Sequence, residues 1–194
     1  MVSLLRYILV HLVLFSCATL LIAQESMGGF PLSFSAVFQE KYGAALPDVQ
    51  TLNVPNVKNI EQEIAKNQTD RRISIPIACQ FDLKNSGTWT EMPNGDRLWR
   101  LQLRAEAAKG LVVMYDHFYL PKGSKLYAYT PNRLQVFGAY TTKNNSTSQR
   151  FLTGILNDDA VVIEYYEPSA VRNQGSLRIF RIDYIFEAVE KVSF

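Results

Sequence analysis

From Ile73 onward the chain alternates apolar and polar residues with a period of two, and this pattern restricts the fold more than any other feature. In residues 98–104, for example, Trp99, Leu101 and Leu103 alternate with arginine and glutamine. Successive side chains of a β-strand point to opposite faces, so the segment predicts a half-buried strand with its arginines in water. A helical pattern would repeat every three or four residues instead.

The same reading predicts a series of short strands separated by turns. Further strands are expected at residues 73–79, 110–120, 125–129, 134–140, 160–166 and 177–186. Gly, Pro and Asn residues mark turns between them, at residues 121–124, 131–132 and 173–175. We therefore expect an all-β fold over residues 73–194, an antiparallel β-sandwich or jelly roll.

Residues 24–72 predict an irregular N-terminal arm with one short helix. Glycines and prolines punctuate residues 24–55, although residues 32–34 could pair with a sheet edge. Between residues 56 and 68, Val57, Ile60 and Ile64 form one apolar stripe at helical spacing. A domain boundary is expected near residue 72, between this helical arm and the sandwich.

Residues 1–23 have the pattern of a signal peptide. Arg6 is followed by an apolar stretch, and Ala23 precedes a polar run, which makes Ala23 the expected cleavage point. The alternative is a retained anchor, but the apolar stretch of residues 7–22 is short for a bilayer. We expect a secreted, periplasmic or cell-surface protein with no stable membrane association after signal removal.

Charge and cysteine content exclude several classes of protein. The chain has 20 basic and 18 acidic residues, a balance that argues against a nucleic-acid-binding surface. Beyond the signal Cys79 is the only cysteine, so no intrachain disulfide can form and packing must hold the fold. Within an apolar strand, Cys79 is expected to be a small buried residue.

No pattern of catalytic or metal-binding residues stands out. The one histidine after the signal, His117, follows Asp116, and neighbours in a strand should point to opposite faces. No Gly-x-Ser-x-Gly turn, zinc-ligand spacing, calcium loop or phosphate loop is present, so we expect no catalytic residue, metal or cofactor. Carboxylate pairs for sugar hydrolysis meet only in the fold, and Glu164 and Glu167 carry no local signal.

Aromatic residues concentrate in three of the expected strands. If exposed, Tyr115, Tyr119, Tyr127 and Tyr129 could stack on sugars, which makes a secreted carbohydrate- or surface-binding module the alternative function. Large aromatic residues also fill cores and form cross-strand pairs, and that interpretation competes with the first.

Several segments in a fixed order resemble one known family. They are Gly87-Thr-Trp89, Asn94-Gly-Asp-Arg-Leu-Trp-Arg-Leu101, Tyr115-Asp-His-Phe-Tyr-Leu-Pro-Lys-Gly-Ser-Lys-Leu-Tyr127, Gly138-Ala-Tyr-Thr141 with Asn144-Asn145, and Val161-Val-Ile-Glu-Tyr-Tyr-Glu-Pro168. Together with the opening Gly28-Gly-Phe-Pro-Leu-Ser-Phe34, they resemble the N-terminal pro-domain region of secreted bacterial serine proteases of the trypsin-like, lysyl endopeptidase type.

The resemblance implies a non-catalytic domain that assists folding of a serine protease domain or inhibits it, in cis or in trans. The catalytic His, Asp and Ser of such a protease have no counterparts in this sequence, so we expect that the chain itself is not an enzyme. It could be the front of a truncated precursor or a stand-alone relative. The arm with Arg71 and Arg72 is a possible cleavable element, and Lys191 a possible processing site.

Overall fold

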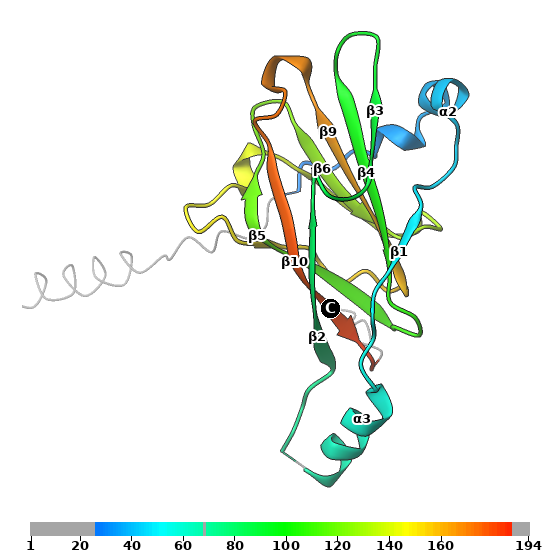
Figure 1. Ribbon diagram of the computed structural model, residues 1–194, viewed down its shortest axis with the longest axis vertical. Coiled ribbons are helices and arrows are strands. Elements are labelled where there is room, and N and C mark those ends of the chain that lie inside the picture. Colours follow the sequence, from blue (N-terminus) through cyan, green and yellow to red (C-terminus); the bar gives the residue numbers. More distant parts are fainter. Residues whose placement is uncertain (1–25, 68, 188–194) are drawn as a thin grey trace, which may run out of the picture.

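The protein is an all-β sandwich, as predicted (Figure 1). The computed structural model describes residues 26–67 and 69–187. The predicted signal peptide, its end at Ala23 and the processing site at Lys191 lie outside the described residues.

Sheet A has six strands, in the order β1-β4-β9-β6-β7, with β3 paired to β4. The strands are β1 (Val49–Thr51), β3 (Thr88–Glu91), β4 (Arg97–Arg104), β6 (Lys125–Tyr129), β7 (Val136–Tyr140) and β9 (Ala160–Glu167). β3 and β1 share one side of β4, because β3 pairs with its first half and β1 with its second half. All pairs are antiparallel except β1 with β4.

Sheet B has four strands, in the order β2-β10-β5-β8. They are β2 (Ser74–Asp82), β5 (Gly110–Tyr119), β8 (Phe151–Leu152) and β10 (Ser176–Ile185), and all pairs are antiparallel. The two sheets enclose one main core, which includes Trp99, Leu101 and Leu103 of β4 against Leu111 and Val113 of β5. Trp99, Leu101 and Leu103 are the alternating residues from which β4 was predicted.

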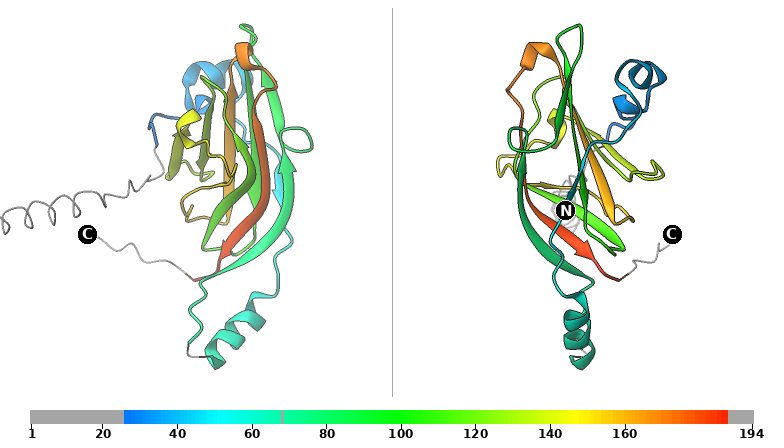
Figure 2. Two further views of the ribbon diagram at one scale, coloured as in Figure 1. Left: turned by 90° about the vertical axis from the view of Figure 1, so that its left-hand side faces the viewer. Right: turned by 45° about the vertical axis from the view of Figure 1, so that its right-hand side comes forward.

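The outer face of sheet A is covered, which the alternation did not predict. Arg100 and Gln102 were expected on a wet face, yet Arg100 is half-buried and Gln102 is 7% exposed. The N-terminal segment lies over this face (Figure 2). Phe38 of that segment is buried and lies beneath the Arg100 guanidinium, 5.6 Å from it.

The N-terminal segment contains two short helices that were not predicted, η1 (Leu32–Phe34) and α2 (Ala36–Tyr42). The expectation that residues 32–34 pair with a sheet edge is wrong. Ser35 ends η1 and caps α2, accepting a hydrogen bond from the Phe38 amide, so the chain turns helical there. Met27 and Gly28 bond the edge of β7 instead, through Ala139.

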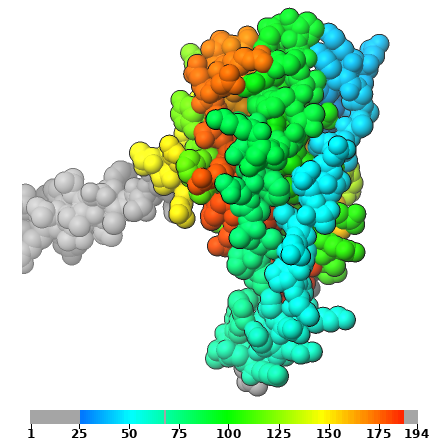
Figure 3. All heavy atoms as spheres, viewed as in Figure 1, coloured from blue at the N-terminus to red at the C-terminus, as the bar shows by residue number. Residues whose placement is uncertain are grey.

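The predicted arm helix is confirmed as α3 (Val57–Lys66), with Asn56 as its N-cap. It projects from one end of the sandwich (Figure 1), and Val57 and Ile60 pack against the margin of the core. The preceding β1 is hydrogen-bonded to β4, so the segment before α3 contributes to sheet A. Figure 3 shows this segment lying along the side of the molecule.

Two short 3-10 helices complete the described elements, η2 (Thr142–Asn144) and η3 (Ser169–Val171). η3 follows directly after β9 and lies near the β3–β4 turn, where the Ser169 amide donates to Asp96 at 2.8 Å. Because of this contact, one end of the sandwich carries a closely packed group of polar side chains.

Candidate functional site

The four candidate tyrosines do not form an exposed row. Tyr115, Tyr127 and Tyr129 are buried, and only Tyr119 is exposed, at 44%. Tyr119 lies on β5 in sheet B, whereas Tyr127 and Tyr129 lie on β6 in sheet A. Burial raises the pKa of Tyr115 and Tyr129, because the phenolate is disfavoured away from water.

His117 and Asp116 lie on the same face, so the expectation that they point to opposite faces is wrong. Asp116 is an extra residue in β5, since Arg178 pairs with His117 while Ile179 pairs with Tyr115. Such a β-bulge resets the alternation of side chains. The His117 Nδ1 atom consequently lies 3.3 Å from Asp116 Oδ1.

Asp116 of this pair forms an ion pair with Arg178. Asp116 accepts two hydrogen bonds from Arg178, at 2.8 and 2.7 Å. They lower the pKa of Asp116 to about 2. The Asp116 carboxylate therefore chiefly holds an arginine of the neighbouring strand.

Cys79 is half-buried on β2, and its thiol lies 3.9 Å from the Ile179 carbonyl oxygen. Burial raises the pKa of Cys79 to about 11, so the thiol stays protonated at neutral pH. Within residues 26–67 and 69–187, no group of three potential ligand residues could hold a metal ion. Nor is any helix among them long and apolar enough to cross a membrane.

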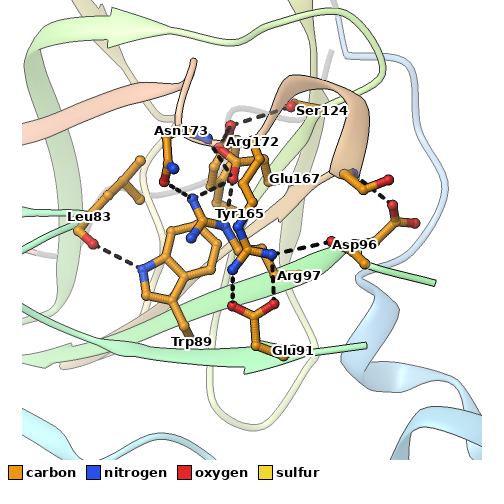
Figure 4. Close-up of polar contacts among 12 residues, drawn as sticks. Leu83, Trp89, Glu91, Asp96, Arg97, Ser124, Tyr165, Glu167, Arg172 and Asn173 are labelled. Atoms are coloured by element: carbon orange, nitrogen blue, oxygen red, sulfur yellow. Dashed lines mark hydrogen bonds and ion pairs between the residues drawn. The ribbon is translucent and has the colours of Figure 1, made fainter. Parts of the chain in front are cut away.

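The polar end of the sandwich is built around Arg97 and Glu167 (Figure 4). Arg97 Nε donates to Glu167 Oε2 at 2.5 Å, and the Glu167 side chain is fully buried. The Arg97 guanidinium also stacks 3.8 Å from the Trp89 ring centroid and donates to Asn173 at 2.6 Å. We call Trp89, Arg97, Tyr165, Glu167 and Asn173 the polar cluster.

Further hydrogen bonds hold every member of the polar cluster in place. Trp89 Nε1 donates to the Leu83 carbonyl at 3.0 Å. The Tyr165 hydroxyl donates to Glu167 at 3.2 Å and lies 3.3 Å from Ser124 Oγ. Because the polar groups of its members bond one another and the neighbouring backbone, the polar cluster forms one connected structural unit.

A hollow of about 350 Å³ opens on the outer face of sheet A, next to the polar cluster. We call it the Glu164 hollow. Its lining comes from the N-terminal segment, the β3–β4 turn, β6 and β9. The lining residues are Phe30, Leu32, Met92, Asn94, Asp96, Lys125, Tyr127, Glu164 and Tyr166.

Glu164 lies at the buried base of this hollow, with 1% of its surface exposed. The Ser33 amide and the Tyr129 hydroxyl donate to its two carboxylate oxygens, at 3.2 and 3.3 Å. Burial is the largest influence and raises the pKa of Glu164, while Arg100 on the neighbouring strand opposes the shift.

Asp96 is the second carboxylate of the hollow, and its environment shifts its pKa in the direction opposite to that of Glu164. It accepts hydrogen bonds from the Tyr166 hydroxyl at 2.5 Å, the Ser169 amide at 2.8 Å and the Asn94 side chain at 2.7 Å. These bonds, led by that from Tyr166, lower the pKa of Asp96. The hollow thus brings together two carboxyl groups whose pKa values are shifted in opposite directions.

An apolar groove of about 520 Å³ adjoins the hollow, between α2 and the β3–β4 turn. Leu32, Met92 and Asn94 line both depressions. Val37 on its rim is 77% exposed and Phe30 on the rim of the hollow is 79% exposed. Apolar surface therefore continues from the helix to the mouth of the hollow.

Sequence reasoning named Glu164 and Tyr127 without finding the site that contains them. It missed Asp96, Lys125 and Ser33 altogether. Ser33 and Glu164 are 131 positions apart, so no local spacing could have paired them. A polar residue among the apolar residues of β9 was the only signal available in the sequence.

Comparison with known proteins adds little to this description. No protein-family model matches the chain. Among solved structures, an isomalto-dextranase from Arthrobacter globiformis T6 complexed with panose aligns with a TM-score of 0.23 and 10% identity. The alignment covers 57% of this chain and 21% of that one, so this chain spans about a fifth of that enzyme. A TM-score this low does not establish a common fold.

Proposed function

We propose that this chain is a non-catalytic pro-domain or accessory domain of a secreted serine protease of the trypsin-like, lysyl endopeptidase type. The observation that carries the proposal is spatial. Four of the segments that resemble this family's pro-domain region lie far apart in the sequence, yet they contribute to the polar cluster or its immediate neighbours (Figure 4).

Each of these four segments supplies at least one residue to the polar cluster or its neighbours. Trp89 comes from the first resembling segment and Arg97 from the second. Ser124 comes from the third, and Tyr165 and Glu167 come from the last. Residues that maintain one structural unit are expected to occur together in related sequences. Their meeting in the polar cluster therefore supports an architecture shared with the family.

The outer face of sheet B is the surface that suits a protease partner. β2 at the edge of sheet B has a strand partner on one side only. Pro76, Ala78 and Gln80 of β2 are exposed on this face. An edge strand can extend a partner's sheet or accept an extended segment by backbone hydrogen bonding.

The arm provides an element that a protease could cut. Arg71 and Arg72 lie between α3 and β2, outside any helix or strand, and both are exposed. Asp70 binds Arg72 with a contact of 2.8 Å, whereas the Arg71 side chain forms no hydrogen bond or ion pair with another described residue. Cleavage after Arg71 would leave the two sheets hydrogen-bonded and separate β1 from β2.

Complex formation tests this proposal. The purified chain is mixed with a secreted lysyl-specific serine protease whose active-site serine is blocked, and the mixture is run on gel filtration. We expect a one-to-one complex that Ala78→Arg disrupts, because a long cation would then stand on the contact face. Val37→Lys, a matched change on the outside of α2, should leave the complex intact. Absence of a complex would refute the proposal.

A further inference from the structure

Tyr127 is a buried residue whose hydroxyl is left without a protein partner. The residue is 4% exposed and lines the Glu164 hollow. No hydrogen bond joins this hydroxyl to another described residue, although Tyr129 on the same strand face bonds both Ser33 and Glu164. Because Tyr127 lines the hollow, the free hydrogen-bonding capacity of its hydroxyl is available to a ligand atom there.

The Lys125 ammonium is a second polar group of the hollow without a partner among the described residues. No ion pair joins the Lys125 ammonium to another described residue, and it lies on β6 two positions from Tyr127. Gly29 passes beside the Tyr127 hydroxyl, so that a methyl group placed there would lie 3.4 Å from it. The N-terminal segment therefore closes one side of the hollow without filling it.

From this arrangement we propose that the Glu164 hollow binds a neutral sugar, with Tyr127 and Lys125 as the residues that contact its hydroxyl groups. This site is additional to the protease partner proposed above. The volume falls within the range of small-molecule sites, of roughly 300–1,000 Å³.

Charge balance favours a neutral ligand over an ion. The anionic Asp96 is offset by the Lys125 ammonium within the same hollow. Glu164 has Arg100 directly across on β4. A charged ligand would disturb this balance and would lose its hydration without a counter-charge.

Hydrogen-bonding capacity favours a ligand with several hydroxyl groups. The Lys125 ammonium donates and the Tyr127 hydroxyl both donates and accepts, which matches hydroxyl groups that are themselves donors and acceptors. Phe30 stands exposed at the rim and Tyr166 lines the wall. An aromatic ring of this kind can pack against the C–H face of a sugar.

The geometry supports binding and not hydrolysis, although two carboxylates share the hollow. Asp96 already accepts three hydrogen bonds, and Glu164 accepts bonds at both oxygens. A nucleophile or proton donor needs an oxygen free to meet the substrate. The groups with free capacity are instead a phenol and an ammonium.

Ligand-observed NMR of the full chain tests this assignment, with glucose, galactose, mannose and N-acetylglucosamine as probes at millimolar concentration. We expect saturation transfer to at least one of them. Tyr127→Phe should weaken its binding about tenfold, the effect of losing one hydrogen bond that includes a desolvated partner. The free energy of unfolding should not fall in this variant, because the hydroxyl bonds no described residue.

Tyr119→Phe, which removes an exposed hydroxyl on the other sheet, is the matched control and should bind as the unchanged chain does. The inference is overturned if none of the four sugars binds, or if Tyr127→Phe binds them equally well. Preferential binding of N-acetyl-lysine amide would also overturn it, since the ligand would then be a cation. The protease complex depends on Ala78 of sheet B, so failure here leaves that proposal intact.

Discussion

At the scale of single residues, the polar cluster depends on close contacts that leave little room for substitution. Gly87 has a φ of +68°, and a Cβ atom there would lie 2.6 Å from Trp99 Nε1 and 2.7 Å from the Arg100 carbonyl oxygen. Arg97 stacks on Trp89 while it neutralises Glu167. Each of these positions belongs to a segment that carries the family resemblance, so their roles can be tested as structural ones.

Gly87→Ala should destabilise the fold by about 3 kcal/mol, because the left-handed backbone and a steric clash both act against alanine. Gly28→Ala is the control: its φ is +66°, but nothing lies within 4 Å of the added methyl group. The control should cost only about 1 kcal/mol of backbone strain. Equal losses for the two variants in urea-induced unfolding would show that the contact with Trp99 is unimportant.

Arg97→Met should cost about 3 kcal/mol in the free energy of unfolding, because it leaves the buried Glu167 carboxylate without its cation. Adding Glu167→Gln to this variant should restore part of the loss. Arg172→Met removes the Arg172–Glu91 pair, whose side chains are 42% and 54% exposed, and should cost far less. Chemical denaturation of the three variants distinguishes these outcomes. An Arg97 effect no larger than the Arg172 effect would argue against a buried ion pair.

Glu164 should make stability depend on pH. Burial raises its pKa above the ordinary 4.5, so the folded chain binds this proton more tightly than the unfolded chain does. The stability from this group is fully present below pH 4.5 and is lost as pH rises through the raised pKa. Thermal unfolding of Glu164→Gln from pH 4 to 8 should lack this decline. Glu40→Gln, at an exposed position, serves as the control. If the unfolding temperatures of Glu164→Gln and the unchanged chain depend on pH in the same way, the burial of an ionisable carboxyl group at Glu164 is contradicted.

At the scale of elements, the N-terminal segment and the strands differ in how far the sequence determines them. Period-two alternation predicted β4, and apolar and aromatic runs between turns predicted β5, β6, β9 and β10, nearly to their ends. It could not predict η1 and α2, whose place depends on contacts such as Ser33 with Glu164 across 131 positions. It also could not predict the bulge at Asp116, which follows from pairing with β10.

Only part of the candidate site could be predicted from the sequence. Tyr127 was selected as an exposed aromatic residue, but its ring is buried and only its position in the hollow gives it a possible role. Lys125 is on the same strand and was overlooked, because an isolated lysine in an alternating segment looks like any solvated residue. Because four separate segments form the hollow, no single segment contains a sequence pattern that would predict it.

The N-terminal segment should be held to sheet A chiefly by Phe38, which is 3% exposed. Phe38→Ala should lower the free energy of local opening of residues 26–46 by about 3 kcal/mol, through loss of buried contacts. Val37→Ala, on the exposed side of the same helix, should change it little. Amide hydrogen exchange reports the difference directly. Unchanged protection in Phe38→Ala would mean that other contacts hold the segment.

At the scale of the whole molecule, the two outer faces of the sandwich differ. The N-terminal segment lies over sheet A, beside the Glu164 hollow and the adjoining groove, whereas the edge strand β2 of sheet B has a strand partner on one side only. A packed core and the polar cluster hold the fold, with Cys79 a free thiol. The two proposals accordingly concern different faces, a small ligand on sheet A and a protein partner on sheet B.

The central claim is that the chain acts on a secreted serine protease and has no proteolytic activity of its own. Its most direct test is the initial rate at which an active lysyl-specific protease hydrolyses a lysyl substrate, measured against increasing concentrations of the chain. The account predicts saturable inhibition that Val37→Lys retains and Ala78→Arg loses. A rate that stays constant at every concentration of the chain would contradict it.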